Sequence, residues 1–302
     1  MADKKKENLV EGETNDQERA YYNSKNTHFL NCKIDGPADG ESAFKECRNI
    51  TVEKCLNNLR YPYWHNENLN IINCTLAEPS RASIWYCNNV NMVGSKILSV
   101  KALRNCNNTI IKDSEIISEE FGWKCDGIKM NNCTLDGQKS FLDSNNVTVE
   151  SCKLKGKYMF QYASNLTILD TTLDSKDFLW HCKNVYCKNC TILGEYLAWY
   201  SENVVLENCY IESIQPLCYC KRLKLINCRM EKCNLAFEYS DVDADVRSHV
   251  DSIKNILNGK VVVDSYGEYV TDDPVYKCVG VLEARNQKGH EQKDEKKTEE
   301  KK

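Results

Sequence analysis

A motif of nineteen residues recurs along most of this chain and limits the folds that the chain can adopt. The motif is Asn-φ-x-φ-x-x-(Cys/Ser/Thr)-x-φ, in which φ is an apolar residue. Its small-residue position falls at Cys32, Cys55, Cys74, Ser95, Ser114, Cys133, Cys152, Thr171, Cys190, Cys209 and Cys228. The first three intervals are 23, 19 and 21 residues, and the next seven are all 19. A fixed period over about 200 residues predicts a solenoid, in which each repeat packs on its neighbours.

The apolar residues within each repeat alternate with polar ones, as in Asn146-Val147-Thr148-Val149. A period of two is typical of β-strands, and no segment shows the 3.6-residue period of a helix. Leucine-rich repeats fit poorly because they need a different spacing and a helical or irregular crossover. We therefore predict an all-β fold, a single-stranded parallel β-helix of about eleven 19-residue coils with about three short strands in each.

The repeat also accounts for most of the 18 Cys of the chain. A second small-residue column lies eight residues before the first, at Ser24, Cys47, Asn66, Cys87, Cys106, Cys125, Ser144, Ala163, Cys182, Ser201 and Cys220. Together the two columns hold 14 of the 18 Cys. A disulfide framework is typical of small secreted domains, and the close pairs Cys187/Cys190 and Cys218/Cys220 lack a second pair for a zinc module. We predict reduced, inward-facing thiols, with no metal site and no cofactor.

Disulfides between stacked Cys stay a second possibility, because neighbouring rungs lie about 4.8 Å apart. Asn opens the motif at nine positions, which are Asn26, Asn49, Asn68, Asn89, Asn108, Asn146, Asn165, Asn184 and Asn203. Asn tolerates left-handed backbone geometry and can bond its neighbours in a stack, so we expect these residues at the turns.

The organisation of the chain follows from where the motif begins and ends. We predict a charged, disordered tail over residues 1–20, the β-helix over 21–240, a capping segment over 241–285 and a Lys/Glu-rich disordered tail over 286–302. No run approaches the roughly 18 apolar residues that span a bilayer, so we expect no membrane partner. The net charge of −4 without a basic block also argues against a nucleic-acid partner. The start lacks the apolar run of a signal peptide, and we expect a cytoplasmic protein.

Candidate ligand-binding residues occupy the strand before the second small-residue column. Ten residues before the motif's small position stand all five tryptophans, Trp64, Trp85, Trp123, Trp180 and Trp199. The next position holds His65, Tyr86, Asn105, Lys124, Asp143, Tyr162, His181, Tyr200, Tyr219 and Glu238, and the position before Trp is mostly apolar. The column with Lys124 and Asp143 must face solvent. Strict alternation would then turn the Trp side chains inward, whereas a bend in the strand would leave them outside. The polar residues Lys45, Arg104 and Gln161 in the Trp column favour the bend.

Under either orientation, one face carries an aromatic or apolar ladder beside a polar one. We interpret it as a groove for an extended ligand such as an oligosaccharide, since flat rings stack on sugars and Tyr, His, Asp and Lys supply hydrogen bonds. An alternative is a stiffening ladder that a protein partner covers, which would make the chain an interaction scaffold.

A third possibility is a polysaccharide lyase or glycoside hydrolase. The carboxylate pair of a hydrolase could combine Asp143 with Glu119, Glu120 or Asp126, and a lyase could use Lys124, Arg104 or His181 as its base. His65 and His181 lie six coils apart, roughly 29 Å, so they cannot share a metal ion.

The chain resembles a bacterial family known as domain of unknown function 3737. The resemblance covers about residues 18–285 and rests on residues 35–42 (DGPADGES), 59–65 (LRYPYWH), 121–125 (FGWKC), 215–220 (QPLCYC) and 236–242 (AFEYSDV). It implies a right-handed parallel β-helix and, more distantly, the pectin-lyase-like superfamily, whose members often bind or cleave acidic polysaccharides. The family has no established activity or catalytic residues to transfer to this chain.

Overall fold

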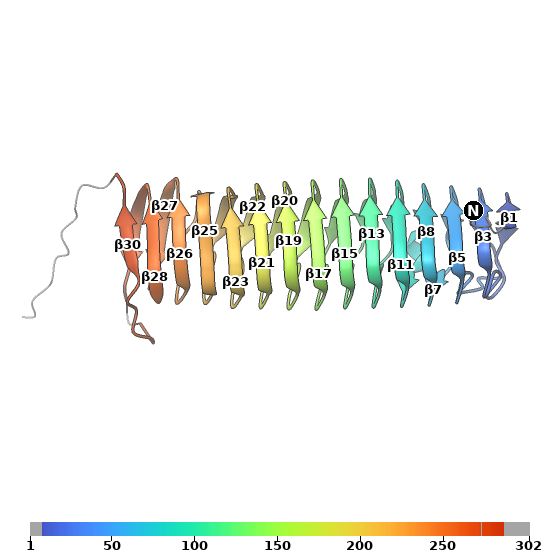
Figure 1. The fold of residues 1–302 in the computed structure, drawn as a ribbon, viewed down its shortest axis with the longest axis horizontal. Coiled ribbons are helices and arrows are strands. Elements are labelled where there is room, and N and C mark those ends of the chain that lie inside the picture. The colour runs from blue at the N-terminus through green and yellow to red at the C-terminus, as the bar shows by residue number, and fades with distance from the viewer. Residues whose placement is uncertain (1–7, 273, 287–302) are drawn as a thin grey trace, which may run out of the picture.

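The computed structural model describes residues 8–272 and 274–286, which wind into a long parallel β-solenoid (Figure 1). One continuous parallel sheet, here called sheet A, runs along its whole length. In the described part of the chain its strands are β1 (Asn8–Glu11), β3 (Lys25–Leu30), β5 (Arg48–Glu53), β8 (Glu67–Ile72), β11 (Asn88–Val93), β13 (Asn107–Lys112), β15 (Asp126–Asn131), β17 (Asn145–Glu150), β19 (Ser164–Leu169), β21 (Lys183–Lys188), β23 (Glu202–Glu207), β25 (Lys221–Met230), β26 (Asp241–Val246), β28 (Asn258–Val263) and β30 (Val281–Ala284).

A second parallel sheet, sheet B, follows the sheet A strands from β1 to β25 after a corner. It consists of β2 (Thr14–Asn15), β4 (Lys33–Ile34), β6 (Leu56–Asn57), β9 (Thr75–Leu76), β12 (Lys96–Leu98), β14 (Glu115–Ile117), β16 (Thr134–Gly137), β18 (Lys153–Lys157), β20 (Thr172–Lys176), β22 (Thr191–Glu195), β24 (Tyr210–Ile214) and the end of β25. Among the described residues, the third side has only the short pair β7 (Tyr63–Trp64) and β10 (Ile84–Trp85), single bridges, and turns. A 3-10 turn, η1 (Glu78–Ser80), lies on the same side, and β27 (His249–Lys254) pairs with β29 (Ser265–Val270).

The predicted parallel β-solenoid is confirmed, with the 19-residue period as its register. Val147 stacks on Leu166, and Leu166 on Val185. The eleven predicted coils correspond to the sheet A strands from β3 to β25, but the described ladder is longer at both ends. Strand β1 adds a rung inside the region predicted as a tail, and β26, β28 and β30 add three inside the region predicted as a cap.

These extra rungs depart from the motif in sequence but keep its inward apolar residues. Val242 stacks on Gly259 after 17 residues, so the period shortens where the motif ends. Residues 1–7 of the tail predicted over residues 1–20, and residues 287–302 of the tail predicted over residues 286–302, lie outside the described residues. No helix among the described residues is long and apolar enough to cross a membrane.

The core between the sheets holds nearly all the cysteines. All eighteen are free thiols, and every one except Cys278 is buried. They do more than fill space, because the small-residue columns form hydrogen-bonded ladders along the solenoid. The backbone N–H of Cys87 donates to Cys106 Sγ at 3.4 Å, and that of Cys74 donates to Ser95 Oγ at 3.0 Å. Cys, Ser and Thr interchange in these columns because each carries, directly on Cβ, a sulfur or oxygen atom that can both accept and donate a hydrogen bond.

Left-handed residues turn the chain at its corners. All nine predicted Asn have φ between 51° and 57°, which confirms the expected left-handed geometry, and each is the second residue of its sheet A strand, directly after the corner. Their side chains bond from rung to rung, as in Asn184 Nδ2 to Asn165 Oδ1 at 2.9 Å. A second such column follows sheet A and was not predicted as a ladder. It includes Asn189, whose Nδ2 donates to Asp170 Oδ1 at 2.9 Å.

Candidate functional site

The predicted ligand-binding residues form a ridge on the third side of the solenoid. The Trp column, with Trp64, Trp85, Trp123, Trp180 and Trp199, is partly exposed, whereas the column before it is buried. The following column also faces solvent and contains His65, Tyr86, Lys124, Asp143, Tyr162, His181, Tyr200 and Tyr219. We call these two columns together the aromatic ridge. Each of these eight residues has a φ between 52° and 60°. This left-handed bend lets two successive residues point outward, so the Trp side chains lie outside the core.

The rings of the ridge stack on one another along the solenoid. Parallel neighbours include Tyr162 and His181, with centroids 5.1 Å apart, His181 and Tyr200 at 5.1 Å, Tyr200 and Tyr219 at 4.7 Å, and Trp180 and Trp199 at 5.7 Å. A shorter stack pairs Trp64 with Trp85 at 5.6 Å and His65 with Tyr86 at 5.1 Å. A sugar ring between two aromatic rings needs about 7 Å, twice the usual carbon contact. The faces inside each stack are therefore closed, and the ring edges and hydroxyls remain open.

The 19-residue period misplaces one member of the ridge. It puts Glu238 after Tyr219, but the next ring belongs to Tyr239, with its centroid 5.8 Å from that of Tyr219. Glu238 instead pairs with Lys254 at 3.3 Å. The interval between the neighbouring small residues Cys220 and Ser240 is 20 here, which moves the column by one residue.

Polar residues separate the two aromatic stacks. Arg104 lies with its guanidinium carbon 4.6 Å from the ring centroid of Trp123 and also pairs with Glu120 at 3.3 Å. Lys124 and Asp143 occupy the next two rungs and are exposed. His181 is stacked between two tyrosine rings. Of the four candidate catalytic residues, Arg104 and His181 are thus engaged in structural contacts.

The carboxylates considered with Asp143 have separate surroundings. Glu120 lies between Arg104 and Lys101. Asp126 lies at the start of β15 and accepts a hydrogen bond from Asn146 Nδ2 at 2.7 Å. Glu119 borders a notch beside sheet B. In the described ranges, no three or more His, Cys, Asp or Glu side chains are grouped to hold a metal ion.

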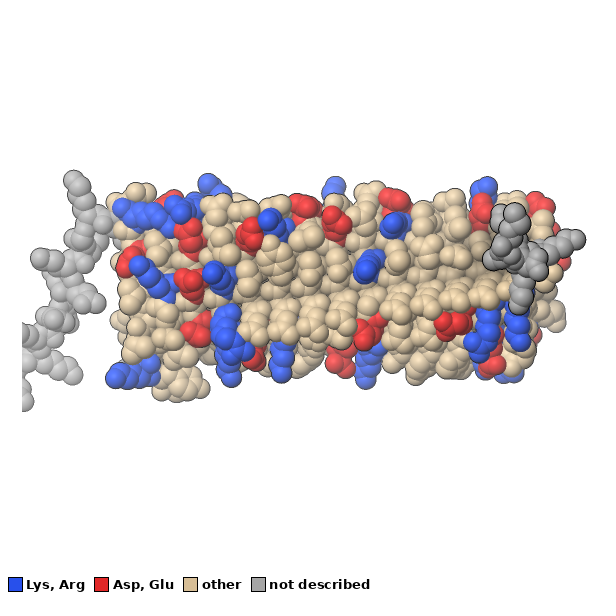
Figure 2. Space-filling model, in the orientation of Figure 1, with Lys and Arg blue, Asp and Glu red and all other residues tan. Residues whose placement is uncertain are grey.

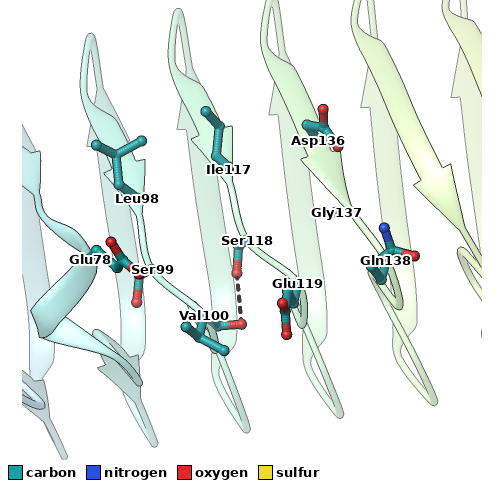
Figure 3. Close-up of a pocket in the computed structure, with 10 residues that line it drawn as sticks. All are labelled: Glu78, Leu98, Ser99, Val100, Ile117, Ser118, Glu119, Asp136, Gly137 and Gln138. Atoms are coloured by element: carbon teal, nitrogen blue, oxygen red, sulfur yellow. Dashed lines mark hydrogen bonds between the residues drawn. The ribbon is translucent and has the colours of Figure 1, made fainter.

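That notch has a volume of about 390 Å³ and lies where sheet B gives way to the third side (Figure 3). Leu98, Ile117 and Asp136 follow one another on β12, β14 and β16, with Glu78 and Gln138 at opposite ends of the row. Its wall is held by Ser118, whose Oγ donates to the Val100 carbonyl at 3.3 Å. The notch is short and combines aliphatic and acidic side chains.

A longer groove on the outer face of sheet A was not predicted as a site. One wall is the Asn ladder, and the other is the column two residues further along each strand. Two hollows of about 290 and 620 Å³ share Gly127 and Lys129. Their lining residues define the sheet A groove: Asn89, Val90, Asn91, Asn108, Thr109, Ile110, Gly127, Lys129, Asn146, Thr148, Asn165, Leu166, Thr167, Asn184, Val185, Tyr186 and Asn203.

The groove is polar but almost uncharged. Figure 2 shows this face: over the middle of the solenoid the charged residues lie mainly toward the upper and lower margins with a largely uncharged band between them, whereas charged residues reach the centre of the face at its left end. Lys129 is the one charged residue among those that line the two hollows. The sequence shows the repeated Asn, but we interpreted them only as turn residues and did not predict that they also line a groove.

Comparison with known proteins places the chain in a family without assigning an activity. A family model described as "Protein of unknown function (DUF3737)" matches residues 8–280. No curated protein matches. The chain is similar in structure to the catalytic domain of a GH87 alpha-1,3-glucanase in complex with nigerose, and to a variant of that domain, each with 11% sequence identity and a TM-score of 0.25. Each match covers 93% of this chain and 64% of the other.

Proposed function

The chain belongs to the family described as protein of unknown function (DUF3737), and we propose that it binds an extended, uncharged, hydroxyl-rich polymer, an oligosaccharide in the simplest case, along the sheet A groove. The observation that carries this proposal is the recurrence of hydrogen-bonding side chains along the groove, where Asn forms one wall at six of the seven rungs and Gly127 stands at the seventh. From Asn89 to Asn203 the groove passes seven rungs, about 29 Å at a spacing of about 4.8 Å.

The Asn ladder leaves hydrogen-bonding capacity for a ligand. Asn165, for example, donates through Nδ2 to Asn145 Oδ1 at 2.7 Å and accepts from Asn184. Each amide has two N–H donors and two acceptor sites, so one of each remains free. Thr148 and Thr167 add hydroxyls on the opposite wall. A linear glycan with one residue per rung can repeat the same contacts, each worth about 0.5–1.5 kcal/mol net.

The charge of the groove favours a neutral ligand. A polyanion such as nucleic acid needs several Lys or Arg along its path, because phosphate contacts dominate its affinity. Lys129 alone supplies a positive charge to the two hollows. The aromatic ridge lies around the neighbouring corner and supports the proposal less, since its ring faces are stacked on each other.

The test is binding to an array of neutral linear glycans, followed by titration of each retained oligosaccharide. The double variant T148Q/T167Q lengthens two side chains in the groove without adding charge. We expect it to weaken binding at least about tenfold, since it removes several contacts. T172Q is the matched control, because Thr172 is exposed on β20 of sheet B, in the same coil as Thr167.

Two results would contradict the proposal. One is the absence of any retained neutral glycan. The other is a retained glycan whose affinity is unchanged by T148Q/T167Q but is lost on Y162A or Y200A, which would place the ligand on the aromatic ridge.

A further inference from the structure

The C-terminal end of the solenoid leaves large apolar side chains uncovered. Val275, Tyr276, Val279 and Val281 are 81%, 56%, 57% and 50% exposed. Leu282 and Ala284 beside them pack on the core but are only partly buried. Solenoids need polar outer faces on their terminal repeats to stay soluble as single chains. Residues 241–285, which the sequence predicts as a cap, thus end in an apolar surface.

The last strand at this end also has an open edge. Among the described strands, β30 pairs only with β28. Natural edge strands are commonly protected by unpaired charges. Here Glu283 is neutralised by Lys260 at 2.8 Å, and Arg285 pairs with Asp264 at 2.8 Å and with Asp245. The charges at residues 283 and 285 are thus paired within the chain, whereas Lys277 in the preceding loop is exposed, so the edge of β30 keeps its capacity to pair with another strand.

The partner of this end must bring apolar side chains. Residues 287–302 consist of Lys, Glu, Gln, Asp, His, Thr and Gly and offer none. The opposite end of the solenoid is a poorer match, since Leu9 there stands close to the acidic residues Glu11 and Glu13. The C-terminal end is itself apolar with a free strand edge, which is the pattern of a self-complementary surface.

We propose that two copies of this chain bind through their C-terminal ends, related by a two-fold axis. Strand β30 then pairs antiparallel with β30 of the second copy, which closes both open edges. Val279 and Val281 of each chain become buried in the contact. This arrangement ends with two chains, because each C-terminal end is used once, whereas end-to-start contact would continue into a filament.

The experiment measures mass by light scattering during size-exclusion chromatography, and shape by small-angle X-ray scattering, over a wide concentration range. We expect twice the chain mass of 34.8 kDa. Each solenoid spans about 67 Å from β1 to β30 at the rung spacing, so the dimer should reach about 135 Å. V279K/V281K places charges on two exposed positions and should raise the dissociation constant of the dimer at least about tenfold.

L9K is the matched control, because Leu9 is a similarly exposed apolar residue, 58% exposed, at the other end. It should leave the mass unchanged. A monomer at all concentrations, or a dimer of about single length, would overturn the proposal. So would growing assemblies that L9K disperses, since these identify end-to-start contact. Circular dichroism of V279K/V281K should match that of the unsubstituted chain, and loss of the β signal would move the test to V281K alone.

Discussion

The hydrogen-bonded columns predict opposite effects of serine and valine substitutions at two cysteines that are equally buried. Cys106 lies in the second small-residue column, where Sγ accepts the Cys87 N–H and donates to the Arg104 carbonyl at 3.2 Å. Cys187 is also 0% exposed, but it lies in an apolar column between Ile168 and Leu206, and no described residue bonds its Sγ. Burial raises the pKa of both thiols well above their usual range, so both stay neutral.

Serine and valine should therefore rank oppositely at the two positions. C106S keeps an acceptor for the Cys87 N–H and a donor for the carbonyl, whereas C106V leaves that buried N–H unsatisfied. We expect C106V to be less stable than C106S by about 1–3 kcal/mol, the usual penalty for an orphaned buried polar group. At residue 187 we expect the serine variant to be the less stable one, because C187S buries a hydroxyl without a partner while C187V retains an apolar side chain.

Equilibrium urea unfolding, followed by tryptophan fluorescence and circular dichroism, measures the stability of these four variants and so the two differences between them. The midpoints should shift while the slope stays constant, which identifies a change in stability rather than in the unfolded state. C106V as stable as C106S would show that the column requires only a small volume. C187S as stable as C187V would show that the apolar column tolerates a hydroxyl, and either result would refute the hydrogen-bond explanation.

Three further predictions follow from single residues. N165A should be less stable to urea than N165G by about 1 kcal/mol, because the φ of 55° at this position strains a side chain with a Cβ but not glycine. Iodoacetamide labelling with peptide mass mapping should modify Cys278 first, because it alone of the eighteen is not fully buried; early labelling of the others would contradict the buried columns. Burial, with Glu238 nearby, raises the pKa of Tyr219 to about 12. The stability from its neutral phenol is thus complete below pH 10 and lost as pH rises toward 12, and urea midpoints across that range, compared with Y219F, should show the loss.

The solenoid could be predicted because its constraints repeat. Each coil must present small residues at the same two corners and apolar residues on the same strands, so one motif appears eleven times. The left-handed corners were also readable, since Asn is common where φ is positive. The end coils were missed because β1, β26, β28 and β30 satisfy only the inward apolar positions. Strand β26 reads DVDADV, in which the alternation remains but neither Asn nor Cys marks the turn.

The sequence predicted that the thiols are buried but not that they form hydrogen bonds. The 19-residue period places Cys106 in a small-residue column and Cys187 in an apolar one, but a column of small residues predicts tight packing without showing which atoms bond. The partner of Cys106 Sγ is a backbone N–H one rung away, and that juxtaposition exists only after the coils stack. Ser in the same columns was the available signal, because a buried Ser needs hydrogen bonds that Ala does not.

The aromatic ridge shows how the fold changes the interpretation of a column of like residues. A column of aromatic residues at a constant period predicts exposed rings, and Tyr162 is indeed 58% exposed. The same period sets neighbouring rings one rung apart, about 4.8 Å, which is close to the spacing of stacked rings. An unbroken aromatic column on a parallel solenoid therefore covers its own faces. The Asn column differs, because an Asn such as Asn165 bonds its neighbours and still has a donor and an acceptor to spare, which is what the proposed ligand requires.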